Sequence, residues 1–189
     1  MSELFSIQLQ NRQQQGRDGV WLDLPTTTEQ VQAALRQIGI SSDNPQGLFI
    51  SGYFAEEEKR FAIPYNMVLA SNVDALNFLA AQLETLSAGE RAELNAALQA
   101  PQSELSSIGK ITDFPENVDY YVHLPDVRGP AQLGDYYLNR SGMVNMPDEW
   151  KGGIDTAQFG RYVAQQEQGA FTQYGYLVKS GDEWQKVHE

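Results

Sequence analysis

The chain has 189 residues, with 25 aspartates and glutamates against 13 lysines and arginines, and a formal net charge of −12 at pH 7. Because cysteine is absent, disulfides, thiolate metal sites and a cysteine nucleophile are excluded. This acidity disfavours contact with nucleic acid and with anionic membrane surfaces and favours a basic partner surface, although it is equally typical of a protein that is merely kept soluble.

Three strands are predicted in residues 1–68. Glu3–Gln10 alternates apolar and polar residues, which is typical of a half-buried strand. Val20–Leu24 is a second apolar run that is stopped by a proline, and Leu48–Phe54 is a third. Their order along the chain predicts a small α+β domain with an antiparallel sheet.

A helix is predicted between the second and third of these strands. Thr26 and Glu29 have the spacing of a capping box, in which each side chain hydrogen-bonds the backbone of the other residue. Apolar residues then recur at helical spacing from Val31 to Ile38, and Gly39 ends the pattern.

Residues 69–113 predict a helical middle domain. Leucines and valine follow at intervals of three or four residues from Ser71 to Leu86, which indicates an amphipathic helix. A second helix is expected to begin at the capping box of Ser87 and Glu90. Between residues 61 and 108 the chain has five acidic residues and one basic residue, so this part is the most strongly acidic.

Residues 114–189 predict a mixed C-terminal domain. Strands are expected at Tyr120–Leu124 and Ala170–Val178, and helices at Ala131–Arg140 and Thr156–Gln165. The whole chain is therefore expected to be an α+β protein in three parts.

A search for catalytic motifs finds no phosphate-binding loop, dinucleotide fingerprint or nucleophile elbow. His123 and His188 cannot form a three-histidine zinc site, and His188 is expected to be frayed. The acidic run Glu56–Glu58 is most simply a solvated loop, although paired carboxylates can act as general acid and base. We therefore expect no catalytic residues, no metal, no cofactor and no enzymatic activity.

Segments that bear on location point to a cytoplasmic protein. No run of about 18 apolar residues occurs, so no membrane span is expected. The first 15 residues are polar and alternating, without the apolar core that a signal peptide requires.

Taken in order, several segments resemble one known family. They are V-W-L-D-L-P at Val20–Pro25, L-F-I-S-G-Y at Leu48–Tyr53, the long helical run Asn72–Leu98, L-G-D-Y-Y-L-N-R-S-G at Leu133–Gly142, F-G-R-Y-V at Phe159–Val163 and G-A-F-T-Q-Y-G-Y-L at Gly169–Leu177. Over roughly Leu4–Val178 the chain resembles the ArdA antirestriction proteins, which are carried on plasmids, conjugative transposons and prophages.

The resemblance implies an elongated homodimer that imitates bent B-form DNA, with surface carboxylates in place of phosphates. Such a dimer occupies the DNA-binding groove of type I restriction-modification enzymes, in their DNA-recognition and methyltransferase core, and so protects incoming mobile DNA. It is not an enzyme and binds neither nucleic acid nor membrane. The C-terminal domain is implied to supply the dimer contact.

The resemblance also implies which residues form these surfaces. The expected acidic, DNA-like surface consists of Glu56, Glu57, Glu58, Asp74, Glu84, Glu90, Glu93, Glu104, Asp113, Glu116, Asp119, Asp126, Asp135, Asp148 and Glu149. The expected dimer contact consists of Tyr136, Tyr137, Met143, Trp150 and Phe159. Some of the acids are expected to cap helices or to pair with Arg128 or Arg140, and Asp74 to interact with a helix dipole.

Two alternatives remain open from the sequence. Asp113–Glu189 has 12 acidic and six basic residues, a weaker excess of acid than the middle segment has. That dilution favours an acidic interaction protein of a mobile element with the same fold and a different basic partner. A small enzyme that uses carboxylates is the least supported interpretation.

Overall fold

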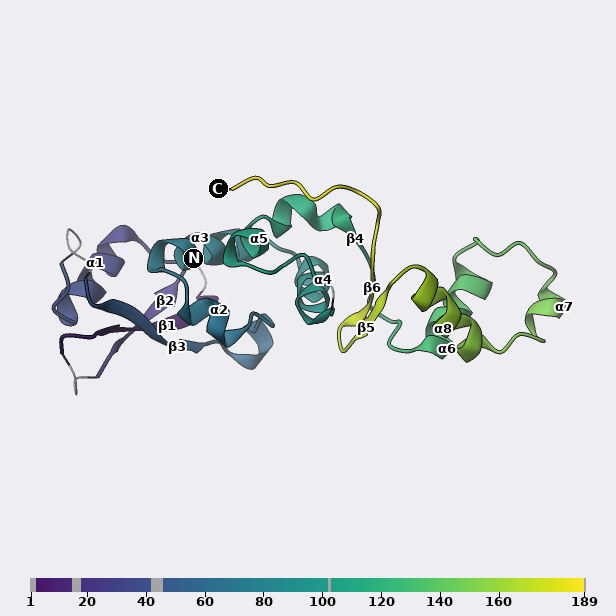
Figure 1. The fold of residues 1–189 in the computed structure, drawn as a ribbon, viewed down its shortest axis with the longest axis horizontal. Coiled ribbons are helices and arrows are strands. Elements are labelled where there is room, and N and C mark those ends of the chain that lie inside the picture. The colour runs from purple at the N-terminus through teal and green to yellow at the C-terminus, as the bar shows by residue number, and fades with distance from the viewer. Residues whose placement is uncertain (1–2, 15–17, 42–45, 102, 189) are drawn as a thin grey trace. The chain divides into compact units, whose positions relative to one another are not determined.

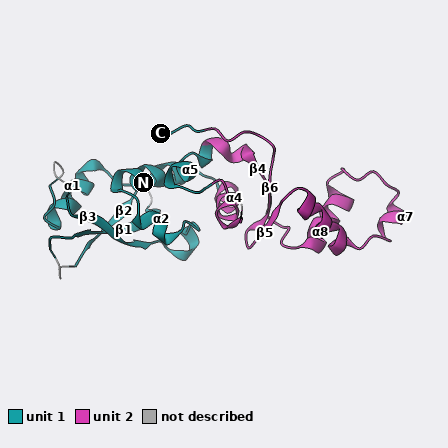
Figure 2. Cartoon of the chain, viewed as in Figure 1, with its two compact units in different colours: residues 1–87, 105–115, 186–189 teal, residues 88–104, 116–185 magenta. Residues whose placement is uncertain are grey.

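The computed structural model describes residues 3–14, 18–41, 46–101 and 103–188. The chain forms two compact units: unit 1 consists of residues 1–87, 105–115 and 186–189, and unit 2 of residues 88–104 and 116–185 (Figure 2). Each unit contains helices and a small antiparallel sheet, so the expected α+β class is confirmed. The division into three parts at residues 68 and 113 stays a prediction.

The sheet of unit 1 is built around the first strand of the chain. β1 (Phe5–Asn11) lies between β2 (Val20–Leu24) and β3 (Leu48–Phe54) and pairs with both in antiparallel register (Figure 1). Ile7 and Leu9 are fully buried, while the alternate residues Ser6, Gln8 and Gln10 are only partly covered. The three predicted strands are therefore confirmed, the first of them from its period-two alternation.

The first helix begins later than its sequence signal predicts. α1 (Thr28–Gln37) is capped by Thr27, whose Oγ1 accepts a hydrogen bond from Gln30 N, while Gln30 Oε1 accepts one from Thr27 N. Thr26 is held elsewhere, because Asn77 accepts from its N–H at 2.7 Å and donates to its carbonyl oxygen at 3.0 Å. The predicted capping box at Thr26 is wrong by one residue because of this distant contact.

The long amphipathic helix of unit 1 is α3 (Val73–Glu84). Asn72 caps it by accepting a hydrogen bond from Ala75 N at 2.8 Å. Leu76, Leu79 and Leu83 are completely buried, as their spacing predicts, and α3 packs against α5 (Ile108–Thr112). The other short helices of unit 1 are η1 (Glu57–Lys59) and α2 (Tyr65–Leu69).

Unit 2 contains a second three-stranded sheet, in which β6 (Gly175–Lys179) lies between β4 (Tyr121–Leu124) and β5 (Ala170–Thr172). α4 (Ala88–Gln99) packs on β4 and β6. The 3₁₀ helix η2 (Phe114–Tyr120) leads into β4.

The single strand predicted at Ala170–Val178 is wrong, because the segment forms the β5–β6 hairpin. Gly175 adopts φ 126°, a conformation that side-chain-bearing residues rarely take. Thr172 Oγ1 accepts from Tyr174 N at 3.1 Å and donates to the Gly175 carbonyl at 2.8 Å, which closes the turn. The turn was not predicted because the aromatic residues of this segment favour a strand on both sides of it.

The helical part of unit 2 is held by a close crossing of α6 (Pro130–Asp135) and α8 (Thr156–Gln166). A Cβ atom on Gly134 would lie 1.9 Å from the Thr156 carbonyl oxygen, and one on Gly160 would lie 1.8 Å from the Pro130 carbonyl oxygen. The two backbones therefore touch at reciprocal glycines. Beside this crossing, Val127, Leu133, Ala164 and Tyr176 form a buried cluster.

The helix predicted at Ala131–Arg140 changes type halfway along its length. Its second half is the π-helix η3 (Tyr136–Arg140), which ends with a hydrogen bond from Ser141 N to the Tyr136 carbonyl at 2.8 Å. The following segment contains the short helix α7 (Asp148–Lys151).

Candidate functional site

The candidate acidic surface is distributed over both units. By sequence, the residues of unit 1 include 12 acidic and seven basic side chains, and those of unit 2 include 13 and six. Nine of the fifteen predicted carboxylate residues are exposed: Glu56, Glu57, Glu58, Asp74, Glu116, Asp119, Asp126, Asp148 and Glu149. Five are half-buried, namely Glu84, Glu90, Glu93, Glu104 and Asp135, and Asp113 is buried.

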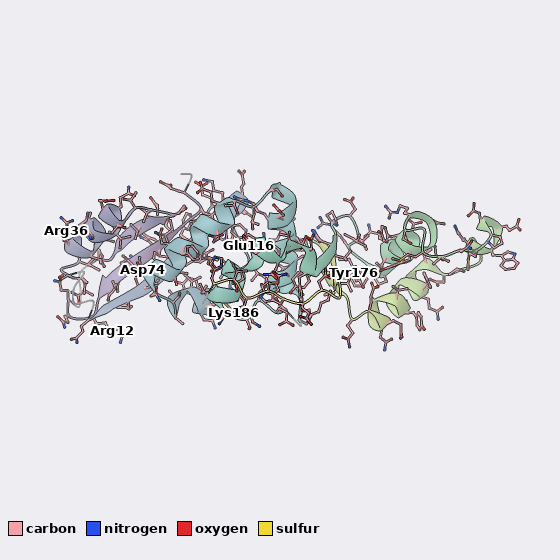
Figure 3. The ribbon with its side chains drawn as sticks, turned by 90° about the horizontal axis from the view of Figure 1, so that it is seen from above. Arg12, Arg36, Asp74, Glu116, Tyr176 and Lys186 are labelled. Carbon is pink, nitrogen blue, oxygen red and sulfur yellow. The ribbon has the colours of Figure 1, made fainter. Side chains whose placement is uncertain are left out.

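Local structure explains how the exposed acids of unit 1 are presented. Glu56 precedes the single turn η1, and Glu57 and Glu58 lie within it. Lys59 pairs with Glu56 at 3.1 Å and offsets one charge of the run. Asp74 lies in the first turn of α3, where its charge is favourable to the helix dipole (Figure 3). Asp74 therefore has a structural role in addition to any role in binding.

Basic side chains compensate several acids of unit 2. Lys179 Nζ lies 2.7 Å from Glu104 Oε1, and this hydrogen bond raises the pKa of Lys179. Arg140 lies 3.4 Å from Asp135, as the sequence predicts. Lys151 lies 2.9 Å from Asp148. These pairs reduce the charge that unit 2 can offer to a basic partner.

Glu93 on α4 differs electrostatically from the other candidates. Its Oε1 is buried and has no hydrogen-bond partner in the part of the chain that the structure describes. Burial, with smaller contributions from the nearby charges of Glu90 and Asp119, raises the pKa of Glu93 to about 7. Near neutral pH Glu93 is therefore partly protonated and supplies only a fraction of a negative charge.

Asp113 is the one predicted surface acid that the fold encloses. It is 1% exposed, and its Oδ1 accepts hydrogen bonds from His188 N at 2.9 Å and from His188 Nδ1 at 2.8 Å. The His188 ring also meets Phe78 edge-on, with centroids 5.0 Å apart. We therefore leave Asp113 out of the proposed surface, and the expectation that His188 is frayed is wrong.

Other exposed carboxylates were not selected from the sequence. They are Glu3, Asp18, Asp23, Glu29, Asp155, Asp182 and Glu183. Glu29 lies in the first turn of α1, where hydrogen bonds, from the backbone first and then from Thr27, lower its pKa. These acids could not be selected from the sequence, because exposure depends on how the folded chain packs.

The residues predicted to form the dimer contact fall into two groups. Met143 and Trp150 are strongly exposed, at 75% and 67% of their possible surface. Tyr136, Tyr137 and Phe159 are half-buried inside unit 2. Only the first two therefore present large apolar surfaces to solvent.

Tyr137 is held in a three-residue hydrogen-bond arrangement. Its hydroxyl donates to Glu167 Oε2 at 2.8 Å, and the Tyr176 hydroxyl donates to Glu167 Oε1 at 2.5 Å. Burial, followed by the contact with Glu167, raises the pKa of both phenols well above the usual range, so both remain proton donors. This arrangement joins η3, the end of α8 and β6.

The described residues contain no cluster of three or more histidine, cysteine, aspartate or glutamate side chains that is suited to a metal ion. Within the same described residues, no helix has the length and apolar character needed to cross a membrane.

Comparison with known families identifies the family to which this chain belongs. Residues 15–178 match the family described as antirestriction protein (ArdA), which covers nearly the whole chain. This chain is a member of the ArdA family. No curated protein sequence matches it.

Membership in the ArdA family implies an antirestriction function, directed at restriction enzymes in general, and ArdA proteins are not known enzymes. The match includes both glycines of the α6–α8 crossing and the three residues of the Tyr137, Glu167 and Tyr176 arrangement. It ends before the segment that contains His188.

Proposed function

We propose that this ArdA protein acts as an acidic homodimer that occupies the DNA-binding groove of type I restriction-modification enzymes. Its exposed carboxylates take the positions of phosphates and accept contacts from lysines and arginines of the enzyme's DNA-recognition and methyltransferase core. Bound in this way, the protein protects incoming mobile DNA in the cytoplasm. The observation that supports the proposal most directly is the set of nine exposed predicted carboxylates, in a chain of the antirestriction family.

The net charge of the protein limits how closely it can imitate DNA. A dimer would have twice the formal charge of −12, which is −24. Duplex DNA reaches that charge in about 40 Å of its axis, at one charge per ~1.7 Å. Internal pairs such as Lys179 with Glu104 lower the effective charge further. Binding is therefore expected to be collective, without a single indispensable carboxylate.

The decisive test is displacement of DNA from a purified type I methyltransferase core across a salt series. A variant with Glu56, Glu57, Glu58, Glu116 and Glu149 all changed to glutamine should compete roughly 50-fold less well at low salt. That estimate assigns about 0.25 kcal/mol to each of the ten exposed charges that the dimer would lose, two for every substituted position. A single Glu149→Gln change should weaken competition only about two-fold.

The matched control changes the same five glutamates to aspartate, which keeps every charge and shortens each side chain. It should compete nearly as well as the original protein, and its competition should weaken as salt rises. Absence of displacement at low salt by the unmodified protein would overturn the proposal. Equal displacement by the glutamine and aspartate variants would show that charge does not drive binding.

The dimer contact is proposed to include Met143 and Trp150. Changing both to serine should weaken self-association roughly 100-fold, because two exposed apolar anchors together contribute about 3 kcal/mol when buried between subunits. Sedimentation equilibrium would measure the dissociation constant. Trp21→Ser is the control, since Trp21 of unit 1 is 50% exposed and lies outside the predicted contact. A dissociation constant unchanged by the double variant would rule out this contact.

A second function is favoured by the diluted acidity of the C-terminal part. With 12 acids, six bases and several internal ion pairs, Asp113–Glu189 is a weaker imitation of DNA than the middle segment. The same fold would then bind a different basic protein of a mobile element. Quantitative pull-down from cells with and without a type I system distinguishes the two, since recovery of a basic non-restriction protein in preference to the restriction enzyme supports this alternative.

A further inference from the structure

Unit 2 contains a cavity that has no part in the proposed imitation of DNA. The cavity has a volume of about 430 Å³ and lies among the ends of α4 and α8 and the strands β4, β5 and β6. That volume is within the ~300–1,000 Å³ of pockets that bind small ligands. Its lining is largely apolar and includes Tyr121, Ala164, Phe171 and Leu177.

One carboxylate lines this cavity without a cationic partner. Glu167 accepts hydrogen bonds from the hydroxyls of Tyr137 and Tyr176, both of which are neutral donors. No basic side chain pairs with Glu167 in the described parts of the chain. The nearest candidate on the lining, Lys179, pairs instead with Glu104.

The position of Glu167 at the end of a helix makes a nearby positive charge more favourable. It is the C-terminal cap of α8, where the helix dipole is negative and a carboxylate is unfavourable. Two hydrogen bonds from phenols offset part of that cost but bring no charge. A cation placed here would interact favourably with both the carboxylate and the end of the helix.

The backbone after Glu167 turns sharply and packs closely against Tyr176. Gln168 follows the cap with φ 54°, a left-handed conformation that is unusual for a residue with a side chain. Gly169 follows, and a Cβ atom there would lie 1.8 Å from the Tyr176 hydroxyl oxygen. These two residues turn the chain from α8 into β5 directly beside the carboxylate.

We propose that this cavity binds a primary alkylammonium ion, with the ammonium group at Glu167 and the short aliphatic chain against the apolar lining. The charge selects a cation, and the lining selects one with an apolar body rather than an inorganic ion. The same group occurs on free amines and on lysine side chains. The proposal rests on the geometry of unit 2 and does not depend on a restriction enzyme.

The test is a titration with n-butylammonium chloride followed by backbone amide NMR of the full chain. The expected result is saturable shifts at Gly169 and Ala170 with a dissociation constant on the order of 1 mM. n-Butanol at the same concentrations should leave these amides unshifted, and ammonium chloride should give only unsaturated, salt-like shifts. An acetylated and amidated Gly-Lys-Gly peptide forms the second arm, because shifts at the same amides would show that a protein's lysine can reach the site.

Two variants make the outcome specific to the cavity. Glu167→Gln keeps hydrogen-bonding partners for both tyrosines while removing the charge, and should weaken binding at least ten-fold. Ala100→Phe adds bulk to the cavity lining at the end of α4 while leaving the charge of Glu167 in place, and should also abolish the shifts. Glu149→Gln, an exposed acid on α7, is the matched control and should leave binding unchanged. Equal binding by Glu167→Gln, or shifts spread over the exposed acids without saturation at Gly169, would overturn the proposal.

Discussion

Gly160→Ala is expected to destabilise unit 2 by roughly 3 kcal/mol, because overpacking at a rigid contact costs about 1–3 kcal/mol and more when backbone must move. The added Cβ would lie 1.8 Å from the Pro130 carbonyl oxygen and 2.8 Å from Gly134 N. Neither atom belongs to a side chain that can rotate away, so α6 and α8 must separate. Chemical denaturation followed by circular dichroism would measure the loss in free energy of unfolding.

Gly152→Ala is the matched control for this change. Gly152 also belongs to unit 2, and a Cβ there would come no closer than 3.9 Å to the Glu149 carbonyl oxygen. Its stability should therefore change by less than about 0.5 kcal/mol. If Gly160→Ala were as mild as this control, the two helices would not be in backbone contact.

Glu93→Gln is expected to stabilise the protein at pH 8 and to have little effect at pH 4.5. The pKa of Glu93 is raised to about 7 in the folded chain from an ordinary value of 4.5, first by burial and then by Glu90 and Asp119. The folded state therefore binds more protons than the unfolded state between these values, and stability falls as pH rises through this window. Glutamine cannot ionise, so the variant does not lose this stability as pH rises.

The expected gain at pH 8 is about 1 kcal/mol, which allows for water that reaches the partly exposed side chain and screens its charge. Denaturation in urea at pH 4.5, 6, 7 and 8 gives the difference between the two proteins at each pH. Glu116→Gln, which removes an exposed carboxylate of the same unit, should change stability by less than about 0.5 kcal/mol throughout. A Glu93→Gln protein less stable than the original at pH 8 would mean that favourable contacts hold the ionised carboxylate.

Glu93 is expected to link pH to the proposed binding of a basic partner. A lysine or arginine of a partner placed near Glu93 would favour its ionised form and lower its pKa. Binding of a basic surface there would release a proton near neutral pH. This proton release would distinguish Glu93 from the exposed glutamates of η1.

Local sequence signals predicted most elements of the fold. The alternation in β1 and the three- and four-residue spacing in α3 depend on residues that are neighbours in sequence, so both were recognised. The errors arose where a distant residue or an unusual backbone conformation intervenes. Asn77 displaces the cap of α1, and the positive φ of Gly175 divides one apparent strand into a hairpin.

For the candidate site, the sequence predicted only which residues are acidic. Sequence identifies acidic residues, but exposure, pairing and proton affinity depend on the fold. Asp113 and His188 are 75 residues apart, and no periodicity relates them. Nothing in the sequence predicts that Glu93 is covered, yet its Oε1 is buried without a hydrogen-bond partner in the described structure.

The chain passes between its two units after residues 87, 104, 115 and 185, so neither unit is a continuous stretch. During synthesis on the ribosome, the residue that encloses Asp113 emerges only after all of unit 2 has been translated. Until then Asp113 lacks the two hydrogen bonds that His188 donates to it. We therefore expect nascent chains truncated before residue 186 to leave unit 1 incomplete.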